Sequence, residues 1–312
     1  MNKCVVTGGA GFIGSALVRG LLAGGAGQVC VIDNLHTGHE ENLEEVRRSI
    51  DFHRADIRDY EAIASLVRGA DTVFHLAAIP SVPRSISEPV LSHEVNADGT
   101  FNVLRACAQG GVGRVVYAAS SSAYGGSDVL PKTESMAPDP KSPYAVQKLT
   151  GEYYARVFHL CFGLETVALR YFNVYGPRQD PSSPYSGVIS VFIKSLCQRR
   201  PPLIHGDGEQ SRDFTYVEDV VDLTLKAALA PGVAGRMFNA GNGNRYTLNH
   251  VWEVLQGIDG VRIPASYGPP RAGDVLHSQA DTAAAIRDLG HAPRFSLEDG
   301  LRRTLAWYRA AA

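Results

Sequence analysis

The sequence lacks several features that mark whole classes of protein. Its 312 residues carry a formal net charge of only −2, so there is no electrostatic reason to expect nucleic acid or an anionic membrane as a partner. No apolar run approaches the roughly 18 residues of a membrane-spanning helix, and no charged-then-apolar leader opens the chain. We therefore expect neither membrane insertion nor secretion.

Cysteine is scarce as well. The five cysteines include no CxxC pair and lie mostly in apolar segments, where cysteine behaves as a small hydrophobic residue. This usage favours a reducing, cytoplasmic environment, and we expect no bound metal. With 45% hydrophobic and 20% charged residues, the chain has the composition of a globular protein with one large domain or two modest ones.

What the sequence does contain is most distinctive at its start. A strand-like run breaks into Gly8, Gly11 and Gly14, with GxxGxxG spacing, before a helical pattern begins. Such glycines allow a sharp turn and a close approach to a pyrophosphate, and the helix N-terminus supplies N–H donors and partial positive charge. A second apolar strand ends at Asp33, where a carboxylate can accept from the adenosine ribose and repel a 2′-phosphate. The sequence thus predicts NAD rather than NADP.

Short apolar strands alternate with helical segments through the first half. This rhythm predicts a Rossmann-type doubly wound parallel sheet. The predicted strands are 3–7, 29–33, 51–54, 72–76, 114–118 and 164–169, and the predicted helices between them include 61–68, 90–109 and 143–161.

The rhythm breaks after about Arg170. Loop-rich segments and helices predicted at 188–198, 217–229, 248–255 and 297–309 indicate a smaller mixed α/β lobe over the carboxyl ends of the strands. We expect a sheet domain over 1–172, with segments near 214–242 returning to it, and a substrate lobe over 173–312.

A second group of residues carries chemistry. Ser142 and Pro143 are typical of a helix start, which puts Tyr144 and Lys148 on one helical face. An ammonium beside a phenol favours the phenolate, so Tyr144 is a candidate base near neutral pH. Upstream, the strand predicted at 114–118 leads to a run of serines from Ser120. In combination with the glycine loop and Asp33, this pattern predicts that Ser120 is catalytic.

With these motifs the chain resembles an extended short-chain dehydrogenase/reductase and, within that group, the NAD-dependent sugar-nucleotide epimerases and dehydratases. The matching segments span nearly the whole length: Thr7–Gly14, Asp33–Asn34, Asp56–Ile57, His75–Ala78, Asn96, Ser120–Gly125, Tyr144–Lys148, Arg170–Asn173, Ser211–Phe214 and Arg271–Asp274.

The resemblance implies further site residues. Around NAD it adds Phe12, Ile13, Asn34, Asp56, Ile57, Leu76, Asn96, Lys148 and Phe172. It also implies that Arg212 and Arg271 hold the diphosphate of a UDP-sugar, which suits the geometry of guanidinium groups, and that Asn173 contacts the same ligand. A homodimer formed through the helices predicted at 90–109 and 143–161 is the expectation for such proteins.

The reaction is narrowed by two missing acids. Related dehydratases carry an Asp-Glu pair at the positions of Ser121 and Ser122. Related decarboxylases carry a glutamate at the position of Ser122. A 4-epimerase needs only a base, a hydroxyl and a reversible hydride acceptor, so we expect 4-epimerisation through a 4-keto sugar with Ser122 against the substrate.

The preferred sugar stays open at this stage. Ser278 aligns with a tyrosine of some epimerases confined to unacetylated UDP-sugars, which leaves room for a 2-N-acetyl group. UDP-glucose, UDP-N-acetylglucosamine and UDP-glucuronate are all candidates. An alternative of another class is a non-catalytic dinucleotide-binding protein, which retention of both Tyr144 and Lys148 disfavours.

Overall fold

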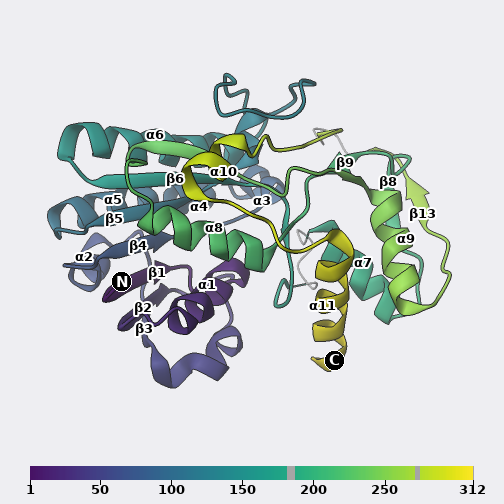
Figure 1. The fold of residues 1–312 in the computed structure, drawn as a ribbon, viewed down its shortest axis with the longest axis horizontal. Helices are drawn as coiled ribbons and strands as arrows, with labels where there is room; N and C mark the ends of the chain where they lie inside the picture. The colour runs from purple at the N-terminus through teal and green to yellow at the C-terminus, as the bar shows by residue number, and fades with distance from the viewer. Residues whose placement is uncertain (181–186, 271–274, 312) are drawn as a thin grey trace.

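Seven parallel strands form the central sheet of the protein, in the order β11-β6-β5-β4-β1-β2-β3 (Figure 1). The fold is taken from a computed structural model that describes residues 1–180, 187–270 and 275–311. The order runs outward from β1 on both sides, which confirms the predicted Rossmann-type fold. The strands are β1 Lys3–Thr7, β2 Gln28–Asp33, β3 Asp51–Arg54, β4 Thr72–His75, β5 Arg114–Ser120, β6 Glu165–Tyr171 and β11 Arg236–Ala240.

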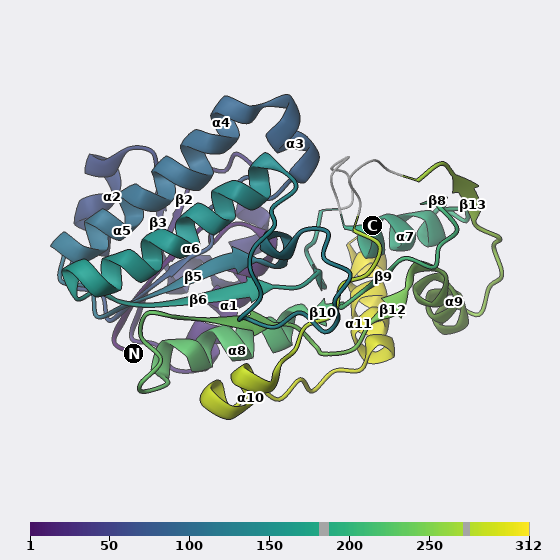
Figure 2. The same cartoon turned by 90° about the horizontal axis from the view of Figure 1, so that it is seen from above.

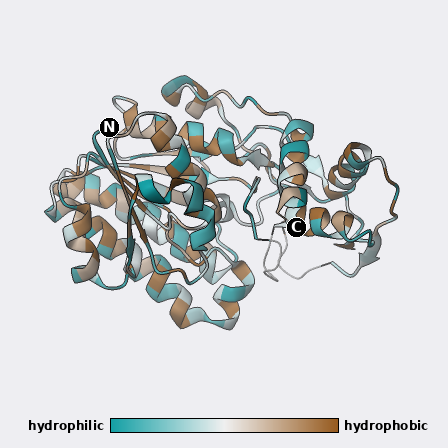
Figure 3. Ribbon diagram, turned by 90° about the horizontal axis from the view of Figure 1, so that it is seen from below, coloured by the Kyte–Doolittle hydropathy of each residue, from teal (hydrophilic) through white to brown (hydrophobic). Residues whose placement is uncertain are grey.

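Helices cover both faces of this sheet (Figure 2). Alternate residues of β1 and β2 enter different cores: Val6 and Val31 pack on one face, and Val5 and Ile32 on the other, as the period of two in a strand requires. The central strands are accordingly hydrophobic along their length (Figure 3). The first face is covered by α1 (Phe12–Ala23), α8 (Val217–Leu229) and α10 (Ala283–Leu289), the second by α2 (Tyr60–Val67), α5 (Thr100–Gln109) and α6 (Pro143–Phe162).

The helix predicted at 90–109 is interrupted. The chain forms α4 (Pro89–His93), a π-helical turn η2 (Glu94–Gly99) and then α5. In the wider turn the buried Asn96 side chain bonds the backbone of Ile79 at both its N–H and its C=O, so a local tertiary contact overrides the regular helical period. The remaining helical segments of this half are η1 (Glu40–Ser49), α3 (Val82–Ser87) and η3 (Ser121–Tyr124).

Beyond β6 the chain builds a smaller lobe from short ladders and helices. The ladders pair β7 (Val174–Tyr175) with β10 (Thr215–Tyr216), β9 (Ser211–Arg212) with β12 (Tyr246–Thr247), and β8 (Leu203–His205) with β13 (Ser266–Gly268). Helices α7 (Val188–Cys197), α9 (Leu248–Asp259) and α11 (Leu297–Ala310) share a core around Phe192, Trp252 and Leu301. Because β7 follows β6 almost directly, the lobe begins at the carboxyl edge of the sheet. None of the helices in the described ranges is long and apolar enough to cross a membrane.

Candidate active site

The glycine turn after β1 has no room for side chains. Gly8 has a φ of +73°, and a Cβ there would lie 2.6 Å from the backbone N of Ala77. A Cβ on Gly14 would lie 2.1 Å from the carbonyl oxygen of Gly8. Gly11 precedes α1 without any side-chain cap, and the first turn of α1 holds no acidic residue. The first turn of α1 therefore offers its backbone N–H groups and the positive end of a helix dipole to an anion.

Asp33 lies next to this turn, at the end of β2. Its carboxylate accepts hydrogen bonds from the backbone N–H groups of Ala10 at 2.9 Å and Leu35 at 2.8 Å. Burial raises the pKa of Asp33, and these two backbone bonds oppose the shift. Two bonds leave acceptor capacity on the carboxylate, since an ionised carboxylate has about four lone-pair sites. The geometry fits the predicted hydrogen bond to a ribose hydroxyl.

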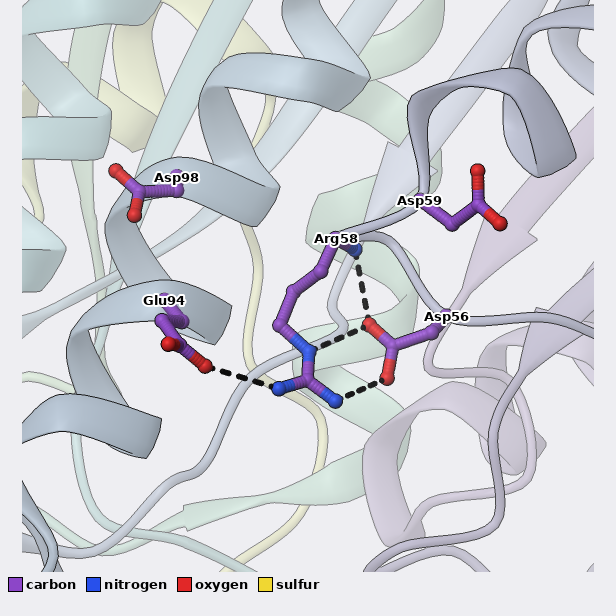
Figure 4. A pocket seen from close by; sticks show the side chains of 5 residues that line it. All are labelled: Asp56, Arg58, Asp59, Glu94 and Asp98. Carbon is purple, nitrogen blue, oxygen red and sulfur yellow. Dashed lines mark hydrogen bonds and ion pairs between the residues drawn. The ribbon is translucent and has the colours of Figure 1, made fainter.

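A charged hollow lies beside the end of β3 (Figure 4). Asp56 accepts from Arg58 at 2.9 Å and from the Asn34 amide at 2.8 Å, and Arg58 also reaches Glu94 at 3.0 Å. Burial favours the protonated form of Asp56, but the hydrogen bonds from Arg58 and Asn34 outweigh it and lower the pKa to about 2. Asp56 is therefore an ionised acceptor, held in place beside Asn34. Asp59 and Asp98 complete the lining.

Other residues predicted around the cofactor line the same edge. Phe12 and Ile13 open α1 and pack against the core of the smaller lobe. The backbone N–H of Leu76 donates to Thr7 at 3.1 Å. Ile57 is buried beneath the π-helical turn, and Phe172 is buried directly after β6.

Asn96 has a structural role in the fold. Besides holding Ile79, its amide donates to Gln147 Oε1 at 2.9 Å. Gln147 precedes Lys148 on α6, so this bond ties the π-helical turn to the helix that carries the Tyr-Lys pair. The sequence did not single out Gln147, because its partner lies 51 residues away. The predicted contact of Asn96 with NAD stays a prediction.

The serine run after β5 forms an ordered hydroxyl chain. Ser120 Oγ accepts from the backbone N–H of Ser122 at 3.2 Å and from the Ser122 hydroxyl at 2.9 Å. A hydroxyl has two acceptor lone pairs and one donor hydrogen. Both lone pairs of Ser120 are occupied, so its O–H is left to donate. Ser122 thus sets the direction of the Ser120 hydroxyl.

Tyr144 and Lys148 project from the first turns of α6. Ser142 caps the helix by accepting from the backbone N–H of Ala145 at 3.2 Å, and Pro143 takes the first helical position. Burial raises the pKa of the Tyr144 phenol, and a hydrogen bond with Ser120 lowers it. Lys148 Nζ donates to the Ala118 carbonyl at 2.8 Å, and burial lowers its pKa to about 7. The structure therefore brings Ser120, Tyr144 and Lys148 to one place at the end of β5.

A buried histidine beneath this group was not predicted as part of the site. Thr100 Oγ1 donates to the Asn96 carbonyl at 2.7 Å, so it accepts from His75 Nε2 at 3.0 Å, and His75 Nδ1 accepts from the Thr7 hydroxyl at 2.7 Å. Burial, helped by the charge of Lys148, lowers the pKa of His75 to about 3. The ring is neutral and stacks on Tyr117 at 5.6 Å. It adds rigidity below Lys148 without adding charge.

Three of the residues predicted to hold the substrate lie close together in the smaller lobe. The Asn173 amide donates to the Ser278 hydroxyl and to the Asp213 carbonyl, both at 3.3 Å. Arg212 Nη1 donates to the Leu276 carbonyl at 3.0 Å. We name Asn173, Arg212 and Ser278 the substrate wall. Arg271, the second predicted diphosphate ligand, lies outside the described residues.

A doubly wound sheet with a glycine cradle and a Tyr-Lys pair at its carboxyl edge defines a Rossmann-type dinucleotide-dependent enzyme. The model of the NAD dependent epimerase/dehydratase family matches residues 4–241, and the chain belongs to this family.

Individual relatives cover the full length. The UDP-glucose 4-epimerase of Mycolicibacterium smegmatis is 37% identical over 98% of each chain. A solved UDP-N-acetylglucosamine 4-epimerase from Methanobrevibacter ruminantium M1, in complex with UDP-N-acetylmuramic acid, is 37% identical with a TM-score of 0.95, covering 100% of this chain and 99% of that one. A UDP-glucose 4-epimerase from Thermotoga maritima, solved with UDP-glucose, is 38% identical with a TM-score of 0.94 and the same coverage.

These matches confirm four predictions: the family, the Rossmann-type fold, the dependence on NAD and the assignment to the sugar-nucleotide 4-epimerases. The roles of individual residues stay predictions, supported by the geometry above.

Proposed function

We propose that the protein interconverts the C4 epimers of UDP-glucose, of UDP-N-acetylglucosamine or of both, through a 4-keto sugar and with NAD held throughout. The observation that carries the proposal is the convergence of Ser120, Tyr144 and Lys148 at the end of β5, beside the glycine cradle. Hydride acceptance and return would be supplied by the cofactor.

The cofactor site fits an NAD molecule by its donor and acceptor set. The glycine turn presents N–H groups to a pyrophosphate, and Asp33 presents a carboxylate to a ribose hydroxyl. The proposed contact residues are Gly8, Gly11, Phe12, Ile13, Gly14, Asp33, Asn34, Asp56, Ile57, Leu76, Asn96, Tyr144, Lys148 and Phe172.

The proton chemistry belongs to the chain itself. Tyr144 takes the proton of the 4-hydroxyl group, directly or through Ser120, and returns it to the same oxygen once the keto sugar has presented its other face and is reduced again. The Ser120 hydroxyl is free to donate to the phenolate oxygen or to the keto oxygen, because Ser122 fills both of its lone pairs. Protonated Lys148 would stabilise the phenolate against the rise that burial imposes on the pKa of Tyr144.

Epimerisation also requires the keto ring to present its other face. We propose that Arg212, Arg271 and Asn173 hold the diphosphate end, so that the sugar can swing about its phosphate linkage while the nucleotide stays in place. Ser122 and Ser278 would then contact the sugar. The small Ser278 side chain, held by Asn173 at 3.3 Å, supports a pocket with room for an N-acetyl group.

The proposed cofactor and substrate sites divide the chain into two parts. We propose an NAD-binding domain over 1–172, to which segments near 214–242 return, and a UDP-sugar lobe over 173–312. The pairing of β11 with β6 supports the return, as does the packing of α8 against the core shared with α1.

We also propose a homodimer. Val146, Tyr153, Val157 and Leu160 lie on one side of α6 at helical spacing, yet they are 49%, 52%, 45% and 68% exposed. An apolar stripe of this length favours burial against a second copy, together with the neighbouring α5. Leu160→Glu should yield monomers in light scattering, whereas Leu229→Glu, at a 65% exposed position on α8, should stay dimeric.

We propose a cytoplasmic location because the cysteines form no disulfide bonds. Cys4, Cys30, Cys107, Cys161 and Cys197 all have free thiols, as a reducing compartment keeps them.

The test of the proposed function incubates purified protein with UDP-glucose, UDP-N-acetylglucosamine or UDP-glucuronate, without added NAD. Products are identified by chromatography and proton NMR. We expect UDP-N-acetylgalactosamine, UDP-galactose or both. Conversion of UDP-glucose alone would contradict the argument from Ser278, and conversion of UDP-glucuronate alone would replace the proposed substrates. No C4 epimer from any of the three, even with NAD added, would overturn the proposed function.

A further inference from the structure

Asp213 is a fully buried carboxylate beside the substrate wall. It lies in the two-residue connection between β9 and β10, directly after Arg212. The resemblance to known epimerases covers this stretch of sequence but gives Asp213 no role. Placing an ionised carboxylate in a core is unfavourable unless donors compensate it.

The donors to Asp213 come from several parts of the chain. Oδ1 accepts from the backbone N–H of Asn242 at 2.8 Å and from the Thr215 hydroxyl at 3.3 Å. Oδ2 accepts from the backbone N–H groups of Gly243 at 2.9 Å and Ala280 at 3.0 Å. Burial raises the pKa of Asp213 to about 6, against the opposing effect of these bonds. With four donors and no exposed surface, the side chain is not available to a ligand.

The segments joined by Asp213 are those that carry the wall. The backbone carbonyl of Asp213 accepts from Asn173, and Arg212 is its neighbour in the chain. Ala280, which donates to Oδ2, lies two residues after Ser278, whose N–H donates to the Ser211 carbonyl at 3.0 Å. The Asp213 side chain therefore ties the segment after Ser278 to the chain that carries Arg212, and the Asp213 backbone carbonyl holds Asn173.

The backbone around Asp213 is shaped to admit it. A Cβ on Gly241 would lie 2.4 Å from Ala280 Cβ and 2.9 Å from Asp213 Oδ2. The Gly241 carbonyl accepts from His291 Nε2 at 2.8 Å, which holds this strand end from the other side. A glycine at this position lets the 241–243 segment approach the carboxylate closely.

We infer that Asp213 is a positioning residue for substrate binding: it locks the segments bearing Asn173, Arg212 and Ser278 into the geometry that holds the nucleotide diphosphate. The inference rests on the proposed function, since it assumes that the wall binds a UDP-sugar. It assigns the affinity of the wall to a residue that never touches the ligand.

The test compares Asp213→Asn with Asp219→Asn. An amide at 213 must turn an NH₂ group toward backbone N–H donors that now meet an oxygen, so at least one backbone hydrogen bond is lost. Asp219 is the matched control: it is also a buried carboxylate, and it accepts from the backbone N–H groups of Arg294 at 2.9 Å and Phe295 at 3.3 Å, away from the wall.

The readouts are the Kd of UDP by calorimetry, KM and kcat for the accepted UDP-sugar, retained NAD and Tm. For Asp213→Asn we expect Kd and KM to rise about tenfold or more, given the loss of charge-assisted hydrogen bonds, with NAD retained and kcat changed less than KM. Asp219→Asn should lower Tm comparably and leave the Kd of UDP unchanged.

If Asp213→Asn does not fold, Thr215→Val decides, because it removes one donor to Oδ1 and keeps the carboxylate. It should raise the Kd of UDP about threefold to tenfold, as the loss of one such bond predicts. UDP affinity within twofold of wild type in the folded variant would overturn the inference, as would equal loss of affinity in Asp219→Asn. Failure of the proposed function looks different, because the wild-type protein would then neither bind UDP nor form an epimer.

Discussion

The cofactor side and the substrate side of this site are built in different ways. On the cofactor side, Asp33 and the glycine turn lie at the carboxyl ends of strands of one continuous parallel sheet, as does the catalytic candidate Ser120, so the backbone ladder fixes their relative positions. On the substrate side, Asn173 and Arg212 lie at two-residue ladders, and hydrogen bonds such as those of Asp213 join them to Ser278. Cofactor geometry thus follows from the sheet, whereas substrate geometry depends on a few side chains.

The largest effect should come from the residue that links the two sides. Tyr144→Phe removes the proposed base without changing the packing of α6, so we expect kcat to fall by about 10³-fold, within the range of general base catalysis. Bound NAD, measured by absorbance after denaturation, should remain. Tyr267→Phe, at a 56% exposed position on β13 outside the proposed dimer stripe, should retain wild-type turnover, and wild-type kcat in Tyr144→Phe would exclude Tyr144 as the base.

A smaller effect is expected where the backbone forms the cradle. Gly14→Ala introduces a methyl group 2.1 Å from the Gly8 carbonyl oxygen, so the turn must open. We expect NAD occupancy of the purified protein to fall severalfold, along with a Tm decrease. The control variant is Gly257→Ala, because a methyl group at this position of α9 meets open space. Gly25→Ala would be a poor control, since the φ of +76° at Gly25 strains any other residue. Gly257→Ala should retain full NAD occupancy, and normal occupancy in Gly14→Ala would contradict the cradle.

The serine chain gives a third test, at the boundary of the two sides. Ser122→Ala frees a lone pair of Ser120, which can then turn its hydroxyl away from Tyr144. We expect kcat to fall about fivefold to tenfold, the worth of one hydrogen bond, with KM nearly constant. Ser121→Ala is the control. A rise in KM alone would mean that Ser122 acts only as a substrate contact.

The last test is a pH dependence of the unfolding free energy on the cofactor side. Burial lowers the pKa of Lys148 from 10.5 to about 7, so between these values the folded protein binds fewer protons at this site than the unfolded chain. Its contribution to the unfolding free energy therefore rises with pH over that window, by at most about 1.4 kcal/mol per pH unit. By urea unfolding of cofactor-stripped protein, the slope of the unfolding free energy against pH should be more positive in wild type than in Lys148→Met. Equal slopes would place the titration elsewhere.

The two sides also differ in how far the sequence predicts them. Strand ends such as Asp33 and Ser120 were predicted because buried parallel strands have a strong local pattern that places their carboxyl ends together. The break at Asn96 was missed because it depends on a bond to Ile79, 17 residues away. The helix at 90–109 was predicted from the local helical periodicity alone, which carries no information on that bond.

On the substrate side, the sequence predicted helices but not the ladders. Two-residue strands such as β9 and β10 are too short to show alternation. Asp213 was missed for a related reason: its partners at Asn242, Gly243 and Ala280 lie 29, 30 and 67 residues away.

The central claim is that the hydride removed from C4 returns to the same carbon, a transfer that a bound NAD would supply. It is tested most directly with the accepted UDP-sugar carrying deuterium at C4, incubated in ordinary water with purified protein and no added cofactor. We expect the C4 epimer to keep its deuterium at C4 by proton NMR and mass spectrometry, with no net change in the redox state of NAD. An epimer carrying hydrogen from the solvent at C4 would contradict the account.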